Sequence, residues 1–135
     1  MTLRLERAYI DEMVAHAQED APNECCGIIA GDGAGRATKL YRAINAEASP
    51  YRYSVEPKDL LRIHNDADAH DWTFLAIYHS HTHTEAYPSP TDVRLAAGWP
   101  DAYYVLISLM DAAHPVIRAF RIIDGAVTEE AIEVA

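Results

Sequence analysis

The chain has 135 residues, half of them hydrophobic, which is the usual size of one domain and enough apolar material for a real core. Its 11 Lys and Arg against 21 Asp and Glu give a net charge of −10. Because an acidic surface repels nucleic acids and anionic lipids, we expect neither as a partner. No run of 18 apolar residues occurs, and the N-terminus is charged where a signal peptide would be apolar, so we expect a cytoplasmic protein without a membrane span.

The first half of the chain combines strand patterns with one helical pattern. Apolar residues that alternate with polar ones, or that form short runs ended by turn residues, predict strands, whereas spacings of three and four predict a helix. By these rules we expect, in order, a strand over 3–5, a helix over 9–19, a buried strand over 25–30, its hairpin partner over 37–43 and an edge-type strand over 51–55.

The second half continues with the same alternation and closes with strands. Proline marks the start of two helices and the end of one, and Asp124-Gly125 is typical of a type I′ hairpin turn. We expect, in order, a helix over 57–68, a central strand over 72–78, a polar loop over 80–88, a helix from Ser89 to before Pro100, and strands over 103–109, 116–123 and from 126 to near 134. This order predicts one domain over residues 1–135, a mixed β-sheet flanked by helices of the α/β or α+β class.

The most informative stretch reads His79-Ser80-His81, seven residues, Ser89, two residues, Asp92. The two His follow an apolar run, and residues two apart on a strand point to the same face. Asp92 returns from the start of the next helix. Two imidazoles and one carboxylate are ligands typical of a catalytic zinc site, with a fourth position for water. The spacing therefore predicts a zinc site of His79, His81 and Asp92.

These residues also have a purely structural interpretation. Ser89 at the N-cap, Pro90 at N1 and an acid at N3 resemble a capping box, and a helix N-terminus can hold an acid as a ligand at the same time. His83 continues the alternate spacing, but it stands in a loop, where the same-face rule lapses. The remaining His are expected to be solvent or core residues: His16, His64, His70 and His114.

A zinc hydrolase also needs a base beside the water, and Glu24 is the best candidate. It stands directly before the buried strand, where partial desolvation raises the pKa of a carboxyl group. An ordinary loop glutamate is the alternative. Cys25 and Cys26 are neighbours that point to opposite faces of a strand, so we expect two reduced, buried thiols and no mutual disulfide.

Glu24, the His79-Ser80-His81 triplet, Ser89 and Asp92 together resemble the motif of the JAMM metallopeptidases, also called the JAB1/MPN+ family, and residues 22–31 resemble the family's Glu-bearing segment. The resemblance implies the JAB1/MPN fold, which has a cytidine-deaminase-like architecture. It implies Zn²⁺ held by the two His and Asp92, with Glu24 moving the proton and Ser89 steadying the oxyanion.

Residues 77–89 and 104–108 resemble the bacterial branch, and more narrowly the peptidases that free cysteine from a ubiquitin-like sulfur-carrier protein in cysteine biosynthesis. The implied partner is that carrier, whose extended C-terminal tail would lie along a sheet edge near 51–55 or 85–87. One departure is Thr82, where most family members have Pro, and this variant resembles the carrier–cysteine branch.

Several questions stay open at this point. An isopeptidase or processing enzyme for another ubiquitin-like protein would use the same chemistry, and a non-catalytic scaffold of the same fold is the alternative outside enzymes. A nucleobase deaminase needs His-x-Glu and Pro-Cys-x-x-Cys, which the chain lacks. The substrate, the choice between monomer and homodimer, and the roles of Cys25, Cys26 and His83 are not fixed by the sequence.

Overall fold

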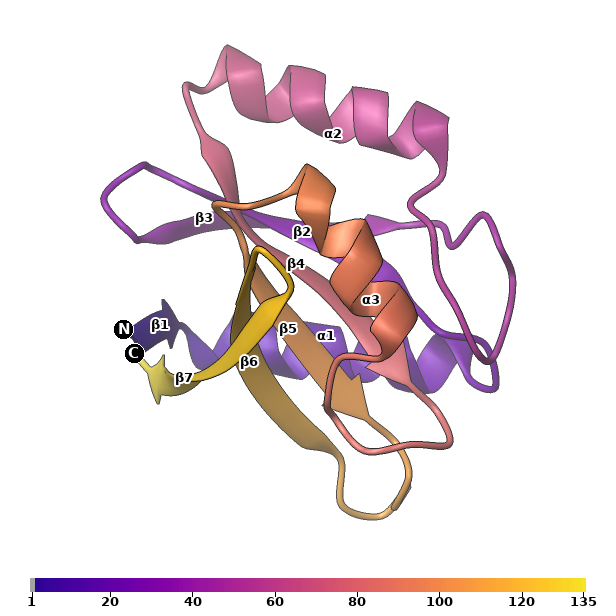
Figure 1. Ribbon diagram of the computed structural model, residues 1–135. Coiled ribbons are helices and arrows are strands. Elements are labelled where there is room, and N and C mark those ends of the chain that lie inside the picture. The colour runs from indigo at the N-terminus through magenta and orange to yellow at the C-terminus, as the bar shows by residue number, and fades with distance from the viewer. Residues whose placement is uncertain (1) are drawn as a thin grey trace.

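The computed structural model describes residues 2–135 and places one mixed sheet between α1 on one face and α2 and α3 on the other (Figure 1). None of the helices in these residues is long and apolar enough to cross a bilayer. The elements are β1 (Thr2–Leu5), α1 (Arg7–Asp20), β2 (Cys26–Gly31), β3 (Ala37–Ala43), α2 (Pro57–Ala69), β4 (Thr73–His81), α3 (Pro90–Leu95), the 3₁₀ helix η1 (Ala96–Gly98), β5 (Tyr103–Ser108), β6 (Val116–Ile123) and β7 (Ala126–Val134).

The sheet has seven strands in the order β1-β7-β6-β5-β4-β2-β3. Strands β4 and β5 are parallel, as are β1 and β7, and the other neighbours are antiparallel. The predicted mixed α/β sheet with flanking helices is therefore confirmed. Strand β4 lies between β2 and β5, whose residues are all buried, so the end of β4 is held on both sides.

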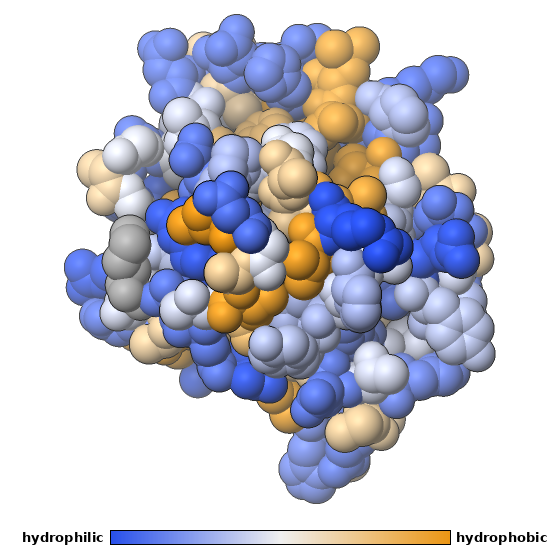
Figure 2. All heavy atoms as spheres, in the orientation of Figure 1, coloured by the Kyte–Doolittle hydropathy of each residue, from blue (hydrophilic) through white to orange (hydrophobic). Residues whose placement is uncertain are grey.

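Alternation along the strands divides the apolar core into two layers. Ile28 packs in the layer under α2 and α3, whereas Ile29 packs in the layer against α1. Cys26 and Cys25 divide in the same way, which confirms the two buried thiols on opposite faces. Burial raises the pKa of each thiol to about 12. At the surface, apolar side chains also gather between α2 and α3, bordered by hydrophilic ones (Figure 2).

Two sequence predictions need correction. Residues 51–55 are not a strand, although Val55 makes one isolated bridge with Asn45. The side chain of Asn45 bonds the carbonyl of Arg52 and the N–H of Ser54 and so takes backbone groups that a neighbouring strand would need. The loop predicted from residue 80 begins at Thr82, because β4 continues through its pairing with β5 to His81.

Gly27 allows β4 to pack closely against β2. A methyl group at this position would overlap the ring of Tyr78, which is buried and whose hydroxyl lies 2.7 Å from Nδ1 of His16. Because the ring is fully buried and its hydroxyl is held by His16, the ring cannot move aside freely. Gly27→Ala should therefore destabilise the protein by about 1–3 kcal/mol and lower Tm by several degrees in calorimetry. Gly98→Ala, where a methyl group meets no atom within 4 Å, is the control. An unchanged Tm for Gly27→Ala would contradict the packing.

Candidate active site

His79 and His81 lie on one face of β4 at its C-terminal end. Both are buried, and their ring centroids are 5.2 Å apart. Tyr53 stacks on His79 with a centroid distance of 4.1 Å and an interplanar angle of 20°. Ser80, between the two His, faces the other layer, where its Oγ accepts a hydrogen bond of 2.8 Å from the N–H of Cys25. The strand thus presents both imidazoles to one point.

Asp92 comes to the same point from the first turn of α3. Its Oδ2 lies 3.2 Å from Nε2 of His79 and 3.1 Å from Nε2 of His81. The same oxygen accepts a 2.9 Å hydrogen bond from the N–H of Ser89, while the N–H of Asp92 donates to Oγ of Ser89 at 3.1 Å. The predicted capping box is therefore confirmed. Because Ser89 Oγ is an acceptor in this cap, its own proton remains for another acceptor.

Glu24 reaches the His pair from the segment before β2. It immediately precedes Cys25 and β2, and the register of β2 on β4 pairs Cys26 with His79. One ligand atom each of Glu24, His79 and His81 lies within 4.8 Å of the others, and all three residues are buried. Glu24 and Asp92 thus both lie close to the imidazole pair.

The surroundings push the two carboxyl pKa values apart. Burial raises the pKa of Glu24 to about 7; His81 opposes this shift and Asp92 adds to it. Burial acts on Asp92 in the same direction, but its close contacts with the imidazoles of His79 and His81 outweigh burial and hold the pKa of Asp92 well below the ordinary range. Two carboxyl groups with such different affinities for protons are typical of a charged ligand or stabiliser beside a base that works near neutral pH.

The two imidazoles also differ. Burial lowers the pKa of His79, which favours the neutral ring that a metal requires. Burial acts likewise on His81, but the contacts with Asp92 and with the carbonyl of Glu85 prevail and raise its pKa. The Nδ1 of His81 lies 2.9 Å from that carbonyl and donates its proton to it. Such a bond fixes ring orientation in metal-binding His residues and leaves Nε2 for the site.

Unpartnered atoms in the cluster fit a cation. Among residues 2–135, four buried side-chain atoms lack a hydrogen-bond partner, and three of them belong here: Oε1 of Glu24 and both ring nitrogens of His79. Nε2 of His79 lies 3.2 Å from Oδ2 of Asp92, but the two atoms are not aligned for a hydrogen bond. Buried polar atoms without partners are costly and rare. Imidazole nitrogens and carboxylate oxygens are the donors that Zn²⁺ takes in catalytic sites. The residues present therefore fit a bound zinc ion.

His83 and Thr82 lie outside this cluster. His83 is exposed, and its ring contacts Tyr51, with 5.8 Å between ring centroids. The hydroxyl of Thr82 donates to the carbonyl of Pro22 at 3.0 Å, with the carbonyl of Pro50 at 3.4 Å. Thr82, the departure from the family pattern, therefore ties the end of β4 to the segment before Glu24, a role without any sequence signal.

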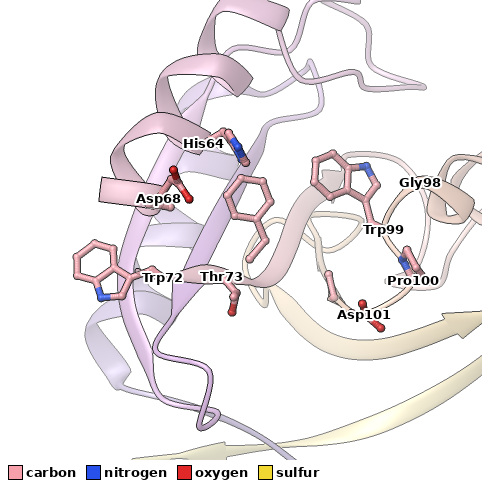
Figure 3. A pocket seen from close by; sticks show the side chains of 11 residues that line it. His64, Asp68, Trp72, Thr73, Gly98, Trp99, Pro100 and Asp101 are labelled. Atoms are coloured by element: carbon pink, nitrogen blue, oxygen red, sulfur yellow. The ribbon is translucent and has the colours of Figure 1, made fainter. Parts of the chain in front are cut away.

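A hollow of about 470 Å³ lies elsewhere, between α2 and η1 (Figure 3). Its walls include Trp72, Phe74 and Trp99. Trp72 precedes β4 and His81 ends it, so the length of this strand, about 26 Å at 3.3 Å per residue, separates the hollow from the imidazoles. The hollow is therefore not part of the cluster.

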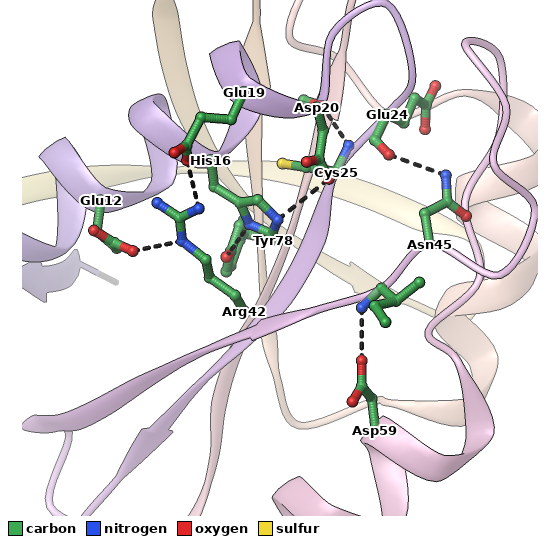
Figure 4. A network of polar contacts seen from close by, with 12 residues as sticks. Glu12, His16, Glu19, Asp20, Glu24, Cys25, Arg42, Asn45, Asp59 and Tyr78 are labelled. Atoms are coloured by element: carbon green, nitrogen blue, oxygen red, sulfur yellow. Dashed lines mark hydrogen bonds and ion pairs between the residues drawn. The ribbon is translucent and has the colours of Figure 1, made fainter.

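A second cavity, of about 660 Å³, adjoins Glu24 at the edge of the sheet. Apart from Glu24, the charged groups here pair with one another: Arg42 bonds Glu12 and Glu19 on α1, and Nε2 of His16 lies 3.3 Å from Asp20 (Figure 4). This pairing connects β3 to α1. Because Arg42 is neutralised by two carboxylates, it is not available to bind an anion in the cavity.

Comparison with known proteins finds JAB-domain proteins and peptidases. The sequence model for prokaryotic homologs of the JAB domain matches residues 6–123. The chain is 46% identical over 126 residues to the CysO-cysteine peptidase of Mycobacterium tuberculosis, covering 93% of this chain and 86% of that protein. It is 31% identical over 106 residues to a probable TtuB-protein conjugate cleaving protease of Thermus thermophilus, covering 78% and 70%. The solution structure of a Desulfitobacterium hafniense protein, 36% identical, superposes with a TM-score of 0.87 and covers 100% of this chain and 93% of that one.

Proposed function

The chain belongs to the family of prokaryotic JAB-domain proteins, and from this premise we propose that it is a zinc-dependent peptidase. Its substrate would be the peptide bond between the C-terminus of a ubiquitin-like sulfur carrier and cysteine. One observation carries the chemical part of the proposal. The buried cluster of Glu24, His79 and His81 contains three polar atoms without partners, beside the carboxylate of Asp92.

In this proposal His79, His81 and Asp92 hold the zinc. When bound, zinc supplies Lewis-acid chemistry, because it lowers the pKa of a water molecule and polarises a carbonyl group. Asp92 suits the ligand role because it is charged, bonded by the N–H of Ser89 and within 3.2 Å of both imidazole nitrogens. The hydrogen bond from Nδ1 of His81 to the Glu85 carbonyl fixes the orientation of the His81 ring and leaves Nε2 for the metal.

Glu24 and Ser89 would carry out the proton transfer and charge stabilisation. Glu24, whose pKa burial raises to about 7, accepts a proton from the attacking water and passes it to the nitrogen of the departing cysteine. The hydroxyl proton of Ser89 is free for the carbonyl oxygen of the scissile bond as that oxygen gains negative charge, and one such donor is typically worth about 3 kcal/mol.

The substrate class rests on the relatives. The mycobacterial relative is named a CysO-cysteine peptidase and matches 93% of this chain. A carrier tail that reaches the site would pass the two adjoining loops, where Tyr51 and Tyr87 present exposed aromatic side chains. Since 51–55 is not a strand, we expect side-chain contacts with Tyr51 rather than strand addition at this segment.

The proposal is tested with a purified carrier–cysteine adduct. Zinc-loaded protein should release free cysteine and the intact carrier, both visible by mass spectrometry, whereas the adduct alone should stay intact. No release by zinc-loaded, folded protein from an authentic carrier adduct would overturn the proposed function.

A second candidate is an isopeptidase acting on a ubiquitin-like protein joined to lysine, favoured by the Thermus relative named for cleaving protein conjugates. The two are separated by offering carrier–cysteine and carrier–lysine substrates side by side. A higher kcat/KM for the lysine-linked substrate would select the isopeptidase.

A further inference from the structure

Asn45 connects Glu24 to the loop that covers His79. We propose that Asn45 is a positioning residue for the hydrolysis: its buried amide holds the Glu24 peptide and the loop of residues 45–55 in one arrangement, so that the base and the imidazole of His79 keep a fixed separation. This inference rests on the proposed function for its catalytic part. Its structural part concerns only side-chain and backbone contacts.

The Asn45 side chain is 8% exposed and makes four hydrogen bonds to backbone groups. Its Nδ2 donates to the carbonyls of Glu24 and Arg52, each at 3.0 Å, and the Glu24 bond is drawn in Figure 4. Its Oδ1 accepts from the N–H of Glu47 at 3.0 Å and of Ser54 at 3.1 Å. Two donors and two lone pairs are all that a carboxamide has, so every one is used.

Both peptide groups of Glu24 end on this loop. Its carbonyl accepts from Asn45, and its N–H donates to the carbonyl of Ser49 at 2.9 Å. The same loop carries Tyr53, whose ring stacks on His79. A shift of the loop would therefore move the Glu24 backbone and the surface against which His79 packs. Catalysis by a positioned base is sensitive to displacements of about 1 Å.

A carboxamide is the side chain that fits here. Aspartate has the same shape, but it loses both donors and places an anionic carboxylate against the carbonyls of Glu24 and Arg52. Like-signed partial charges at hydrogen-bond distance in a buried place push the segments apart. Asn45→Asp is therefore the sharpest substitution, and Asn65→Asp, the same change on the exposed surface of α2, is its matched control.

The experiment compares Asn45→Asp, Asn65→Asp and the unchanged protein, each loaded with zinc and given the carrier–cysteine adduct. We expect Asn45→Asp to lose about 10- to 100-fold in kcat with zinc content unchanged and KM within about twofold, because the base is misplaced while the ligands stay. In a Glu24→Gln background the same change should have less than about a twofold effect, since no base remains to be positioned.

A second readout needs neither zinc nor activity. In the metal-free protein, amide hydrogen exchange at Glu24, whose N–H donates to the carbonyl of Ser49 on this loop, should be at least about tenfold faster in Asn45→Asp than in Asn65→Asp, because the repulsion pushes the loop away from Glu24. If Asn45→Asp does not fold, Asn45→Ser, which keeps one donor and one acceptor, takes its place in both measurements.

Several results would overturn the inference about Asn45. Unchanged kcat in a folded variant, or a loss equally large in the Glu24→Gln background, would overturn the inference. Failure of both Asn45 variants to fold would do so as well, because Asn45 would then be a folding residue. Inactivity of the unchanged protein would instead reject the proposed function, and the exchange rates would still decide whether Asn45 holds the Glu24 segment.

Discussion

Replacing Glu24 with Gln should lower kcat for the carrier–cysteine adduct by about 10²- to 10⁴-fold, the usual contribution of a general acid–base group, while zinc content stays unchanged. Gln preserves the shape of the buried side chain but cannot carry a proton from water to the leaving amine. Steady-state kinetics with metal analysis of the same sample measures both quantities. Glu133→Gln, an exposed position on β7, is the control. A Glu24→Gln enzyme with full kcat would remove Glu24 from the reaction.

The same substitution should stabilise the metal-free protein at alkaline pH. Burial raises the pKa of Glu24 from its ordinary 4.5 to about 7. A carboxyl group with a raised pKa in the folded state is destabilising once ionised: the cost is absent below pH 4.5, grows between 4.5 and 7, and is complete above 7. At 1.36 kcal/mol per pH unit this cost is about 3 kcal/mol.

Denaturant unfolding in the presence of a chelator measures the effect. Glu24→Gln should exceed the unchanged protein in free energy of unfolding by up to about 3 kcal/mol at pH 8 and by nearly nothing at pH 4. Equal stabilities at pH 8 would mean that the Glu24 carboxylate is not desolvated in the folded protein. The expected combination, an inactive but more stable variant, is typical of a residue retained for chemistry.

The second large effect concerns Asp92. Asp92→Asn should weaken zinc binding by at least about 100-fold, because removing a ligand is expected to exceed the 10- to 100-fold loss seen when an outer hydrogen-bond partner is removed. Asn retains an oxygen for the Ser89 N–H, so the start of α3 should remain folded. Calorimetric titration with zinc measures the affinity, and exposed Asp111→Asn is the control.

Activity should follow occupancy in the same proteins. Chelation should abolish cysteine release by the unchanged protein, and added zinc should restore it, whereas Asp92→Asn should stay inactive at equal zinc. Zinc affinity should also fall at acid pH, because His81, whose pKa its contacts with Asp92 and Glu85 raise despite burial, must lose a proton to bind metal. Full activity of Asp92→Asn after exhaustive chelation would reject the ligand set.

Local pattern was sufficient for most of the fold. The strands over 37–43 and 116–123 agree with the structure to the residue, because their ends coincide with turn-forming sequence. The I′ turn is confirmed by positive φ angles of 51° at Asp124 and 79° at Gly125. The prediction of a strand over 51–55 was wrong. Alternation within a segment cannot reveal that the side chain of Asn45, 7 residues before Arg52, donates a hydrogen bond to the Arg52 carbonyl.

The site residues also fall into those that local sequence spacing could bring together and those that it could not. His79, His81, Ser89 and Asp92 lie within 14 residues of one another, so strand geometry and helix capping sufficed to bring them together. Glu24 is 55 residues from His79, and its place depends on the β2–β4 register, which no local spacing encodes. Tyr53 packs on His79 from a loop whose alternating pattern predicted a strand, which is why its contact with His79 could not be predicted.

The burial of Cys25 and Cys26 has a practical benefit for the enzymology. A thiol reagent such as an aromatic disulfide reacts with thiolates, and both side chains are fully enclosed with pKa values of about 12. The folded enzyme should therefore contribute almost no background colour. The reagent can then count the free cysteine released from a carrier that itself lacks thiols, once the carrier and the uncleaved adduct, whose cysteine thiol also reacts, have been removed by filtration. The rate of slow colour development from the enzyme alone would, conversely, measure how often the folded core opens and exposes these two thiols.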